Sequence, residues 1–438
     1  MFRRKIEERL YEYYKNPDDR VLIVEGARQV GKSFIIRHTA KNSFENFIEI
    51  DLKADLEGDR LFANAKSTRD FYLALSSKYG QSLGDFQNTI VFLDEIQFYP
   101  HLMTLLKELK KEDRFRYIAS GSLLGVTLRQ IFIPMGSIEE VRMFPLDFEE
   151  FLWANGVGVD VVSYLRRCFD DVAEVGEDIH SRILRLFKDY LISGGFPDAV
   201  KEYVINQNVQ RMRKVHDEIF AYYSADCSQY DNEHRLKIMR IYGSLISNMQ
   251  NKVKRVQFKK IEGLANANAE KYVDEFDYLA YSGVALFTRA VSNPVFPLSE
   301  TSSKNLLKLY YNDVGILTNL LFKNNINAIL ANDKGINLGC VYETACACEL
   351  ASHGHELFYF DSKKTGEVDF LINDYDKLSA VPIEIKSGND QNNFRAIPKL
   401  VDRNGNYKLS CGYVFGNKNV AVRQNDLIIM PVYMIMFA

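Results

Sequence analysis

The sequence Val21-Leu22-Ile23-Val24-Glu25-Gly26-Ala27-Arg28-Gln29-Val30-Gly31-Lys32-Ser33 decides which fold is expected for the first part of the chain. Its apolar residues 21–24 predict a short buried strand. Residues 26–33 match the pattern of a phosphate-binding loop, which is Gly, four free positions and then Gly-Lys-Ser. Residues 34–38 can continue as a helix. A strand, this loop and a helix in that order predict an α/β domain.

The residue types in this loop suit phosphate chemistry. The glycines let successive backbone N–H groups and the helix N-terminus face a β-phosphate, while Lys32 reaches the β- and γ-oxygens. The hydroxyl of Ser33 can ligate Mg²⁺. We therefore expect ATP and Mg²⁺ to bind here. The expected binding residues are Gly26, Ala27, Arg28, Gln29, Val30, Gly31, Lys32 and Ser33. The alternative, a chance glycine-rich turn before a helix, is weakened by a second motif.

That second motif is Thr89–Glu95, an apolar strand that ends in two carboxylates. At the end of a strand near the loop, Asp94 would organise the Mg²⁺ shell, and Glu95 would act as the general base on the attacking water. An acidic pair can also simply begin a helix. Combined with the loop upstream, the catalytic interpretation is favoured, and it makes Lys32, Asp94 and Glu95 the catalytic residues. After the next strand, Ser122 either senses the γ-phosphate or caps a helix.

Short apolar runs separated by helical patterns organise the first third of the chain. They occur at residues 21–24, 47–50, 90–93 and 117–119, and they predict a parallel sheet with helices on both faces. We expect four regions in total. They are an ATPase core at 1–146, a helical lid and connector at 147–235, a middle module at 236–303 and an α/β domain at 304–438. In the middle module, residues 283–287 predict the strand of a small wing.

Further motifs extend the pattern along the chain. The chain resembles the prokaryotic AAA-superfamily ATPases that carry a C-terminal domain of unknown function. The segments that carry the resemblance are residues 23–33, 92–97 and 144–152, Gly194-Gly195-Phe196-Pro197 and residues 310–315. The resemblance covers nearly the whole chain. It implies an ATP-dependent P-loop NTPase core, a helical lid, a winged-helix-like middle module and a nuclease-like terminal fold.

A second polar constellation lies near the C-terminus. Residues 367–372 and 381–386 alternate apolar and polar side chains and are separated by a turn-prone segment, so they predict two strands. In an antiparallel pair, Asp369 and Glu384 could bind a second Mg²⁺, and Lys386 could orient a water or stabilise a phosphate. The alternative is a half-exposed sheet with a salt bridge between Asp369 and Lys386.

This Asp…Glu-x-Lys pattern resembles the restriction-endonuclease-like fold. Glu343 on the preceding helical segment fits the additional acidic position of that fold. The resemblance implies a nuclease-like site of Glu343, Asp369, Glu384 and Lys386. Such a domain can also keep its polar site and only bind nucleic acid.

The charge balance limits the kinds of partner. The chain has 438 residues, with 55 Lys and Arg against 58 Asp and Glu, and its net charge of −3 excludes a protein that is basic throughout. A nucleic-acid surface would have to be local. Residues 252–260 contain five cations and no acid, and they predict either a solvated segment or a contact with double-stranded DNA.

Apolar patterning and cysteine usage predict a cytoplasmic protein. No apolar run approaches the roughly 20 residues of a membrane helix. The apolar C-terminal residues 427–438 are interrupted by Pro431 and predict a pair of buried strands. The six cysteines are dispersed, which fits a reducing compartment.

The sequence therefore predicts an Mg²⁺-dependent ATPase coupled to a C-terminal domain that could bind DNA. Two alternatives are an ATP-gated Mg²⁺-dependent nuclease and a switch in which ATP binding without hydrolysis controls attachment to DNA or protein. A homo-oligomer is compatible with all three.

Overall fold

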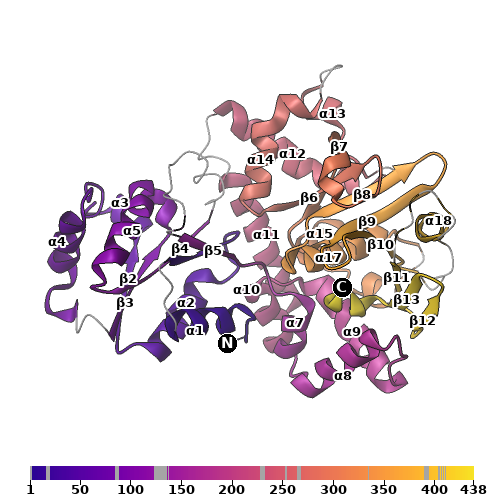
Figure 1. Ribbon diagram of the computed structural model, residues 1–438, viewed down its shortest axis with the longest axis horizontal. Coiled ribbons are helices and arrows are strands. Elements are labelled where there is room, and N and C mark those ends of the chain that lie inside the picture. Colours follow the sequence, from indigo (N-terminus) through magenta and orange to yellow (C-terminus); the bar gives the residue numbers. More distant parts are fainter. Residues whose placement is uncertain are drawn as a thin grey trace. The chain divides into compact units, whose positions relative to one another are not determined.

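The computed structural model describes residues 2–15, 20–83, 88–122, 136, 138–226, 232–251, 254–263, 268–333, 335–388, 394–402, 405, 407, 409 and 411–438. The chain divides into two compact units. We call residues 3–144 with 281–283 the N-terminal unit, and residues 145–280 with 284–438 the C-terminal unit. Figure 1 labels their elements, and each unit is described by itself.

The N-terminal unit is built on a five-stranded sheet with the order β2-β3-β4-β1-β5. All four neighbouring pairs are parallel. The strands are β1 (Val21–Glu25), β2 (Asn46–Asp51), β3 (Thr89–Asp94), β4 (Arg116–Gly121) and β5 (Ile138–Arg142). The first four contain the four apolar runs of the sequence, so the predicted parallel α/β fold is confirmed for this unit. Carboxyl ends of parallel strands share one edge of the sheet, and the loops that follow β1, β3 and β4 therefore meet there.

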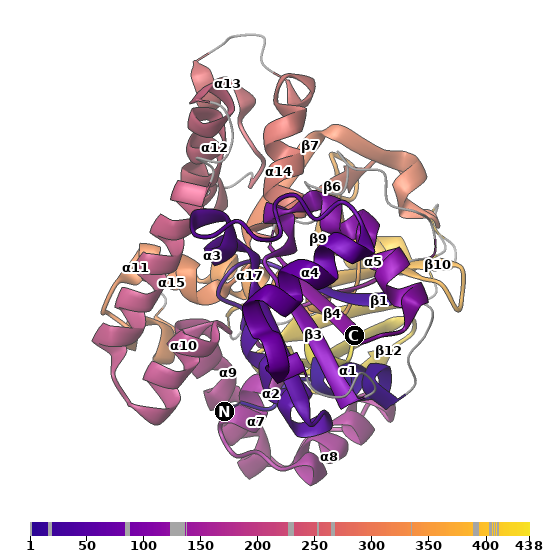
Figure 2. The same ribbon diagram turned by 90° about the vertical axis from the view of Figure 1, so that its left-hand side faces the viewer.

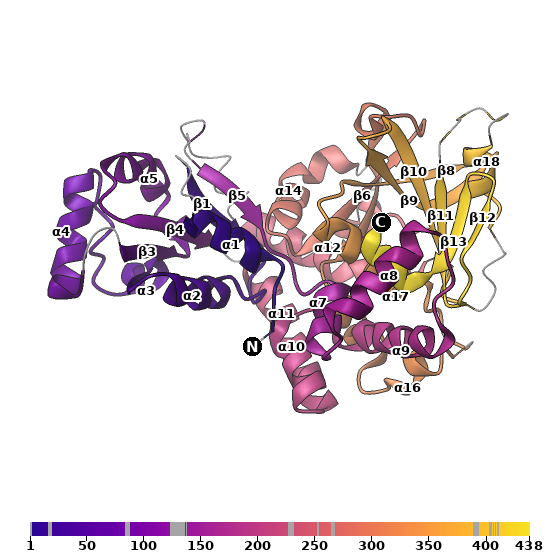
Figure 3. The same cartoon turned by 60° about the horizontal axis from the view of Figure 1, so that its bottom comes forward.

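Helices cover both faces of this sheet, as Figure 3 shows for α2 and α5. One face packs its alternate strand residues, such as Ile23, Leu93 and Tyr117, against α4 and α5 in a continuous apolar core. Because side chains alternate along a strand, the intervening residues Leu22 and Val24 are buried on the other face. The helices are α1 (Ile6–Lys15), α2 (Lys32–Ser43), α3 (Leu52–Glu57), α4 (Thr68–Tyr79) and α5 (Pro100–Glu112), with 3₁₀ turns η1 (Gly80–Leu83) and η3 (Ile96–Phe98).

The C-terminal unit contains an eight-stranded mixed sheet with the order β12-β13-β11-β10-β9-β8-β6-β7. Pairs β6–β7, β8–β9, β9–β10 and β12–β13 are antiparallel, and the other three are parallel. The strands are β6 (Ala285–Val291), β7 (Ser302–Tyr311), β8 (Leu357–Ser362), β9 (Gly366–Asp374), β10 (Ser379–Ile385), β11 (Gly412–Gly416), β12 (Val422–Gln424) and β13 (Leu427–Pro431).

The C-terminal unit also contains helices, which precede the first strand of this sheet in the sequence or lie between its strands. Helix α17 is almost entirely buried and contacts β6, β7, β8 and β10. Figure 2 gives a second view of the helical region. The helices are α7 (Phe148–Ala154), α8 (Val159–Asp170), α9 (Glu177–Ser193), α10 (Pro197–Val200), α11 (Val209–Asp226), α12 (Asn232–Gln250), α13 (Phe258–Glu262), α14 (Val273–Tyr281), α15 (Val314–Phe322), α16 (Asn327–Leu330), α17 (Gly339–Ser352) and α18 (Ile397–Val401). Shorter turns are η4 (Lys201–Ile205), η6 (Ala269–Tyr272), η7 (Leu298–Thr301) and η8 (Val432–Phe437).

Three features differ from the sequence-based expectations. Residues 285–287, expected within a small wing, begin β6, which pairs with both β7 and β8 inside the large sheet. The expected boundary between residues 303 and 304 falls inside β7. The C-terminal apolar run forms one strand, β13, and then η8 in place of a second strand. Among the described residues, no helix is long and apolar enough to span a membrane.

A buried turn after α9 is held by a single carboxylate. Asp313 accepts hydrogen bonds from the backbone N–H of Gly195 at 2.6 Å and of Ile316 at 3.2 Å. On the other side of the turn, Leu146 N–H donates to Gly195 O at 2.7 Å. A Cβ at Gly195 would lie 2.1 Å from Leu146 O, so only glycine fits this close approach of two backbones.

Replacement Gly195→Ala is expected to lower the free energy of unfolding by about 3 kcal/mol, because the added methyl collides with backbone that cannot move without breaking these hydrogen bonds. The matched control is Gly243→Ala on the exposed side of α12, where an added Cβ has no heavy atom within 4 Å. That control should leave stability unchanged or raise it by about 0.5–1 kcal/mol. Urea unfolding followed by circular dichroism measures both variants, and equal stabilities would contradict the prediction.

Candidate functional site

The loop between β1 and α2 has the backbone conformation that its glycines allow. Gly26 and Gly31 have φ of 150° and 97°, and a Cβ at Gly26 would lie 2.1 Å from Met143 O. Helix α2 begins at Lys32, and no side chain caps its N-terminus. The first backbone N–H groups of α2 therefore remain available to an anion, and the helix dipole favours negative charge at this point.

Lys32 folds back onto its own loop. Its Nζ donates hydrogen bonds to the carbonyl oxygens of Gly26 at 2.9 Å and Ala27 at 2.8 Å, and the residue is only 6% exposed. Burial lowers the pKa of Lys32 to about 8, although the carboxylates of Glu95 and Asp94 oppose this shift. A phosphate at the loop would offer Lys32 anionic acceptors in place of the two carbonyl oxygens.

Asp94 connects the loop to the ends of two strands. Its Oδ1 accepts hydrogen bonds from Ser33 Oγ at 2.9 Å and from Ser120 Oγ at the end of β4. Burial raises the pKa of the Asp94 carboxyl, and the two serine hydroxyls oppose that rise. A hydroxyl and a carboxylate in contact are the oxygen donors that Mg²⁺ prefers. The donor set therefore fits the predicted Mg²⁺ ligands Ser33 and Asp94.

Glu95 follows β3 with a strained backbone, having φ 56° and ψ 48°. Its Oε2 accepts hydrogen bonds from Ser122 Oγ at 3.0 Å and from Gln97 Nε2. Gln97 also donates to Ser122 at 3.3 Å. The left-handed conformation turns the Glu95 side chain away from the strand direction, and the two polar neighbours then hold its carboxylate in place. The structure thus brings Ser122 to Glu95. The residues that follow Ser122, where a capped helix would begin, lie outside the described residues.

Two residues of this site were not predicted from the sequence. Arg4, near the start of the chain, donates to Val30 O at 3.0 Å and to Phe144 O at 2.8 Å, so it supports the loop from outside. Gln97 restrains the carboxylate of Glu95. Gln97 could have been found from the sequence, because it lies two positions after Glu95. Arg4 lies 22 positions before the loop, and no local sequence pattern indicates its role. Arg28 of the loop is 8% exposed.

The predicted C-terminal residues also come together. The two predicted strands are β9 and β10, and they are antiparallel, with Phe370 opposite Ile383. Continuing this register by one residue places Asp369 opposite Glu384. Asp369 Oδ2 accepts a hydrogen bond from Ile385 N–H at 2.8 Å. The alternative salt bridge from Asp369 to Lys386 is not found, because Lys386 Nζ pairs with Glu384 Oε1 at 2.7 Å.

Glu343 on α17 faces the same group of charges. Lys254 Nζ forms an ion pair with its Oε1, and Tyr310 Oη donates to its Oε2 at 3.5 Å. Burial raises the pKa of Glu343, the Asp369 carboxylate adds to this, and Lys254 opposes it. Burial likewise raises the pKa of Glu384 to about 8, with Asp369 adding and Lys386 opposing. The four predicted residues therefore share one electrostatic environment, which we call the acidic cluster: Glu343, Asp369, Glu384 and Lys386.

The basic stretch 252–260 is divided by the structure. Lys254 and Arg255 are used internally, in ion pairs with Glu343 and Asp361. Lys259 and Lys260 lie exposed on α13, while Lys252 is outside the described residues. The stretch is therefore not one uniform solvated patch.

Another group of polar side chains lies in the C-terminal unit. Within the described residues, Asp147, Glu349 and His353 are the group whose ligand atoms all lie within 4.8 Å of one another. Both carboxylates serve as helix caps, since Asp147 accepts from Glu150 N–H at 2.8 Å and Glu349 from Phe148 N–H at 2.9 Å. Asp369 and Glu384 are outside this group.

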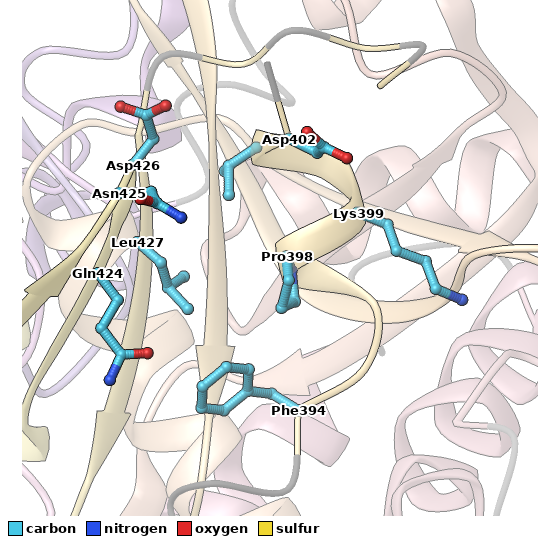
Figure 4. A pocket seen from close by; sticks show the side chains of 9 residues that line it. Phe394, Pro398, Lys399, Asp402, Gln424, Asn425, Asp426 and Leu427 are labelled. Carbon is cyan, nitrogen blue, oxygen red and sulfur yellow. The ribbon is translucent and has the colours of Figure 1, made fainter. Parts of the chain in front are cut away.

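A pocket of about 710 Å³ lies between α18 and the β12–β13 hairpin. Figure 4 shows Lys399 on the helix, Asp402 directly after its end, and Gln424 to Leu427 on the hairpin side. Lys399 Nζ donates to Lys364 O at 3.2 Å. The pocket contains none of the predicted site residues.

Sequence families match three regions of the chain. The AAA domain family matches residues 18–152, which contain the loop and the acidic strand end. This region has an AAA-type P-loop ATPase fold. That fold supports ATP binding and hydrolysis, usually with Mg²⁺. Two domains of unknown function, DUF8612 and DUF4143, match residues 184–327 and 338–435.

The solved structures that match this chain are distant in sequence. A Walker-type ATPase of Pyrococcus abyssi is 17% identical, with 74% of this chain and 96% of that chain covered and a TM-score of 0.45. A Saccharomyces cerevisiae Hsp104 complex with casein is 14% identical, covering 64% and 50%, with a TM-score of 0.29. The Pif1 helicase from Candida albicans is 15% identical, covering 42% and 48%, with a TM-score of 0.24. A comparison with curated proteins finds no match.

ATP affinity is expected to fall about tenfold between pH 7 and pH 9. With a pKa of about 8 in the ligand-free protein, Lys32 is mostly charged at pH 7 and mostly neutral at pH 9. Phosphate binding favours the charged form, so at the higher pH binding must be accompanied by proton uptake. Isothermal titration calorimetry at both pH values measures the change.

The variant Lys32→Met is the control for this pH dependence. It should bind ATP more weakly than the wild type. Its ATP affinity should not fall between pH 7 and pH 9, because the methionine side chain does not titrate. Equal wild-type affinities at pH 7 and pH 9 would contradict the assigned role of Lys32.

Proposed function

We propose that this protein is an Mg²⁺-dependent ATPase whose reaction takes place at the loop 26–33 and the end of β3. The observation that carries the proposal is the hydrogen bond between Ser33 and Asp94, with Glu95 next in the chain. It unites the phosphate loop with the acidic strand end. Bound Mg²⁺ would neutralise charge on the β- and γ-phosphates.

Each residue has a distinct task in this proposal. Backbone N–H groups of the loop and the first turn of α2 bind the phosphates, and Lys32 exchanges its two carbonyl acceptors for phosphate oxygens. Ser33 and Asp94 hold the metal ion. Glu95 accepts the proton of the attacking water, and Gln97 and Ser122 orient its carboxylate. In this proposal Ser122, which is bonded to this carboxylate, would also sense the γ-phosphate.

Replacement Glu95→Gln is expected to lower the rate of ATP hydrolysis by about 10²–10⁴-fold while ATP binding is retained, because it removes the base without changing the loop. Lys32→Ala should abolish hydrolysis and weaken binding. Phosphate release and nucleotide binding are measured separately. The matched control is Glu57→Gln at the exposed end of α3, which should hydrolyse ATP at the wild-type rate.

Two outcomes would decide against this function. An unchanged turnover in Lys32→Ala would contradict the site itself. Tight ATP binding by the wild type without phosphate release would instead favour the non-hydrolysing switch, in which nucleotide binding alone controls attachment to DNA or a protein.

A second candidate function is Mg²⁺-dependent cleavage of double-stranded DNA at the acidic cluster. Its support is the proximity of Asp369 and Glu384 on neighbouring strands, with Lys386 bonded to Glu384. The two carboxylates would hold the metal ion, and Lys386 would stabilise charge on the cleaved phosphate.

For this second candidate, the wild type is expected to cleave labelled double-stranded DNA in the presence of Mg²⁺ and ATP, and Asp369→Ala should lose cleavage because it removes a metal ligand. The ATPase rate of Asp369→Ala should stay at the wild-type value, since the residue lies in the other unit. Cleavage that persists in Asp369→Ala would reject nuclease activity at this cluster and leave the ATPase proposal intact.

A further inference from the structure

Residues 254–256 bind to β7, the edge strand of the eight-stranded sheet, and their side chains reach β8 and α17. Val256 is buried, and its N–H donates to Leu307 O of β7 at 2.8 Å. Arg255 pairs with Asp361 on β8, and its guanidinium lies 5.7 Å from the centre of the Tyr359 ring. This segment is anchored by one backbone hydrogen bond, one buried side chain and two ion pairs. We call it the basic strap.

The first residue of the basic strap places its ammonium group among the carboxylates of the cluster. Lys254 Nζ is bonded to Glu343 Oε1, and its side chain is only 17% exposed. Asp369 acts on the same ammonium, because both Glu343 and Asp369 favour its charged form against the effect of burial. Lys254 therefore supplies a positive charge beside Glu343, close enough to act on Asp369, which is one of the two predicted ligands of the second metal ion.

The cluster keeps one buried acceptor that the protein does not use. Glu384 Oε1 accepts from Lys386, but Glu384 Oε2 has no hydrogen-bond partner within the described part of the chain. The residue is 9% exposed. A buried carboxylate oxygen without a partner is costly, so this atom points to a cation that is accommodated beside Glu384.

We propose that Lys254 is an internal cation that closes the acidic cluster, and that a divalent metal ion enters only when the basic strap withdraws. The ammonium beside Glu343 excludes a metal ion at Asp369 and Glu384, because two cations close together in a buried site repel each other strongly. The basic strap then acts as an autoinhibitory segment. This proposal concerns the occupancy of the cluster alone and does not depend on ATP hydrolysis or DNA cleavage.

The proposal is tested by Mn²⁺ binding to the full chain without nucleotide, measured by electron paramagnetic resonance. Lys254→Met is expected to bind a single Mn²⁺ ion at the acidic cluster. Its affinity for this ion should exceed that of the wild type by about tenfold or more, because the competing charge is gone. This gain should disappear in the double variant Lys254→Met with Asp369→Asn. The matched control is Arg255→Met, which removes the neighbouring charge from the same segment and should bind Mn²⁺ like the wild type.

Several results would overturn the proposal. They are equal Mn²⁺ affinities in wild type and Lys254→Met, a gain that survives Asp369→Asn, or an equal gain in Arg255→Met. Lys254→Gln provides a second neutral variant if Lys254→Met does not fold, as checked by circular dichroism.

A measurement on the wild type tests the same competition without changing Lys254. Hydrogen exchange at the Val256 amide reports whether the basic strap stays bound, since this N–H donates to Leu307 O. Raising the Mn²⁺ concentration should accelerate that exchange, and Asp369→Asn should prevent the acceleration. Exchange at Val256 that stays unchanged throughout the Mn²⁺ titration would show that metal and strap do not compete, and would overturn the proposal.

Discussion

The side chain of Asp94 is the point on which the N-terminal unit depends, because it joins three elements at one edge of the sheet. It ends β3, accepts a hydrogen bond from Ser33 at the start of α2, and accepts another from Ser120 at the end of β4. Strand β4 lies between β1 and β3 in the sheet. All three strands are parallel, so their carboxyl ends meet, and residues about sixty positions apart in sequence become neighbours. The nucleotide site follows from strand order as much as from the loop itself.

In the C-terminal unit, several carboxylates lie close together on the eight-stranded sheet and on the neighbouring helix α17, and their charges have to be balanced. Each of three acids has a lysine partner: Glu343 with Lys254, Glu367 with Lys308, and Glu384 with Lys386. Asp369 instead accepts a backbone N–H from the neighbouring strand. Charge is thus largely balanced by the protein's own cations. One of these, Lys254, comes from a segment outside the strands and helices, so it can leave without dismantling the sheet.

The two units differ in how much of them could be predicted from sequence. Strands β1, β2, β3 and β4 are continuous apolar runs, and the antiparallel pair β9–β10 alternates in a way that periodicity detects. Residues 285–287 were apolar enough to predict a strand, but local pattern does not reveal which sheet a strand joins. The apolar residues after Pro431 form a buried 3₁₀ helix and not the predicted strand. A continuous apolar run shows that a segment is buried, but it has no periodicity that distinguishes a helix from a strand.

By itself, the sequence determined the chemistry that each site can perform: a glycine-rich loop with Lys32 and Ser33, carboxylates at 94 and 95, and an Asp…Glu-x-Lys pattern near the C-terminus. These depend on residue type and short spacing, which are local properties. Only the tertiary structure decided which distant groups complete each site. Arg4 supports the loop and Lys254 enters the acidic cluster because folding places them there, 26 residues from Val30 and 89 residues from Glu343, respectively. No local propensity encodes contacts of that range, since they arise from strand order and from the balance of buried charge.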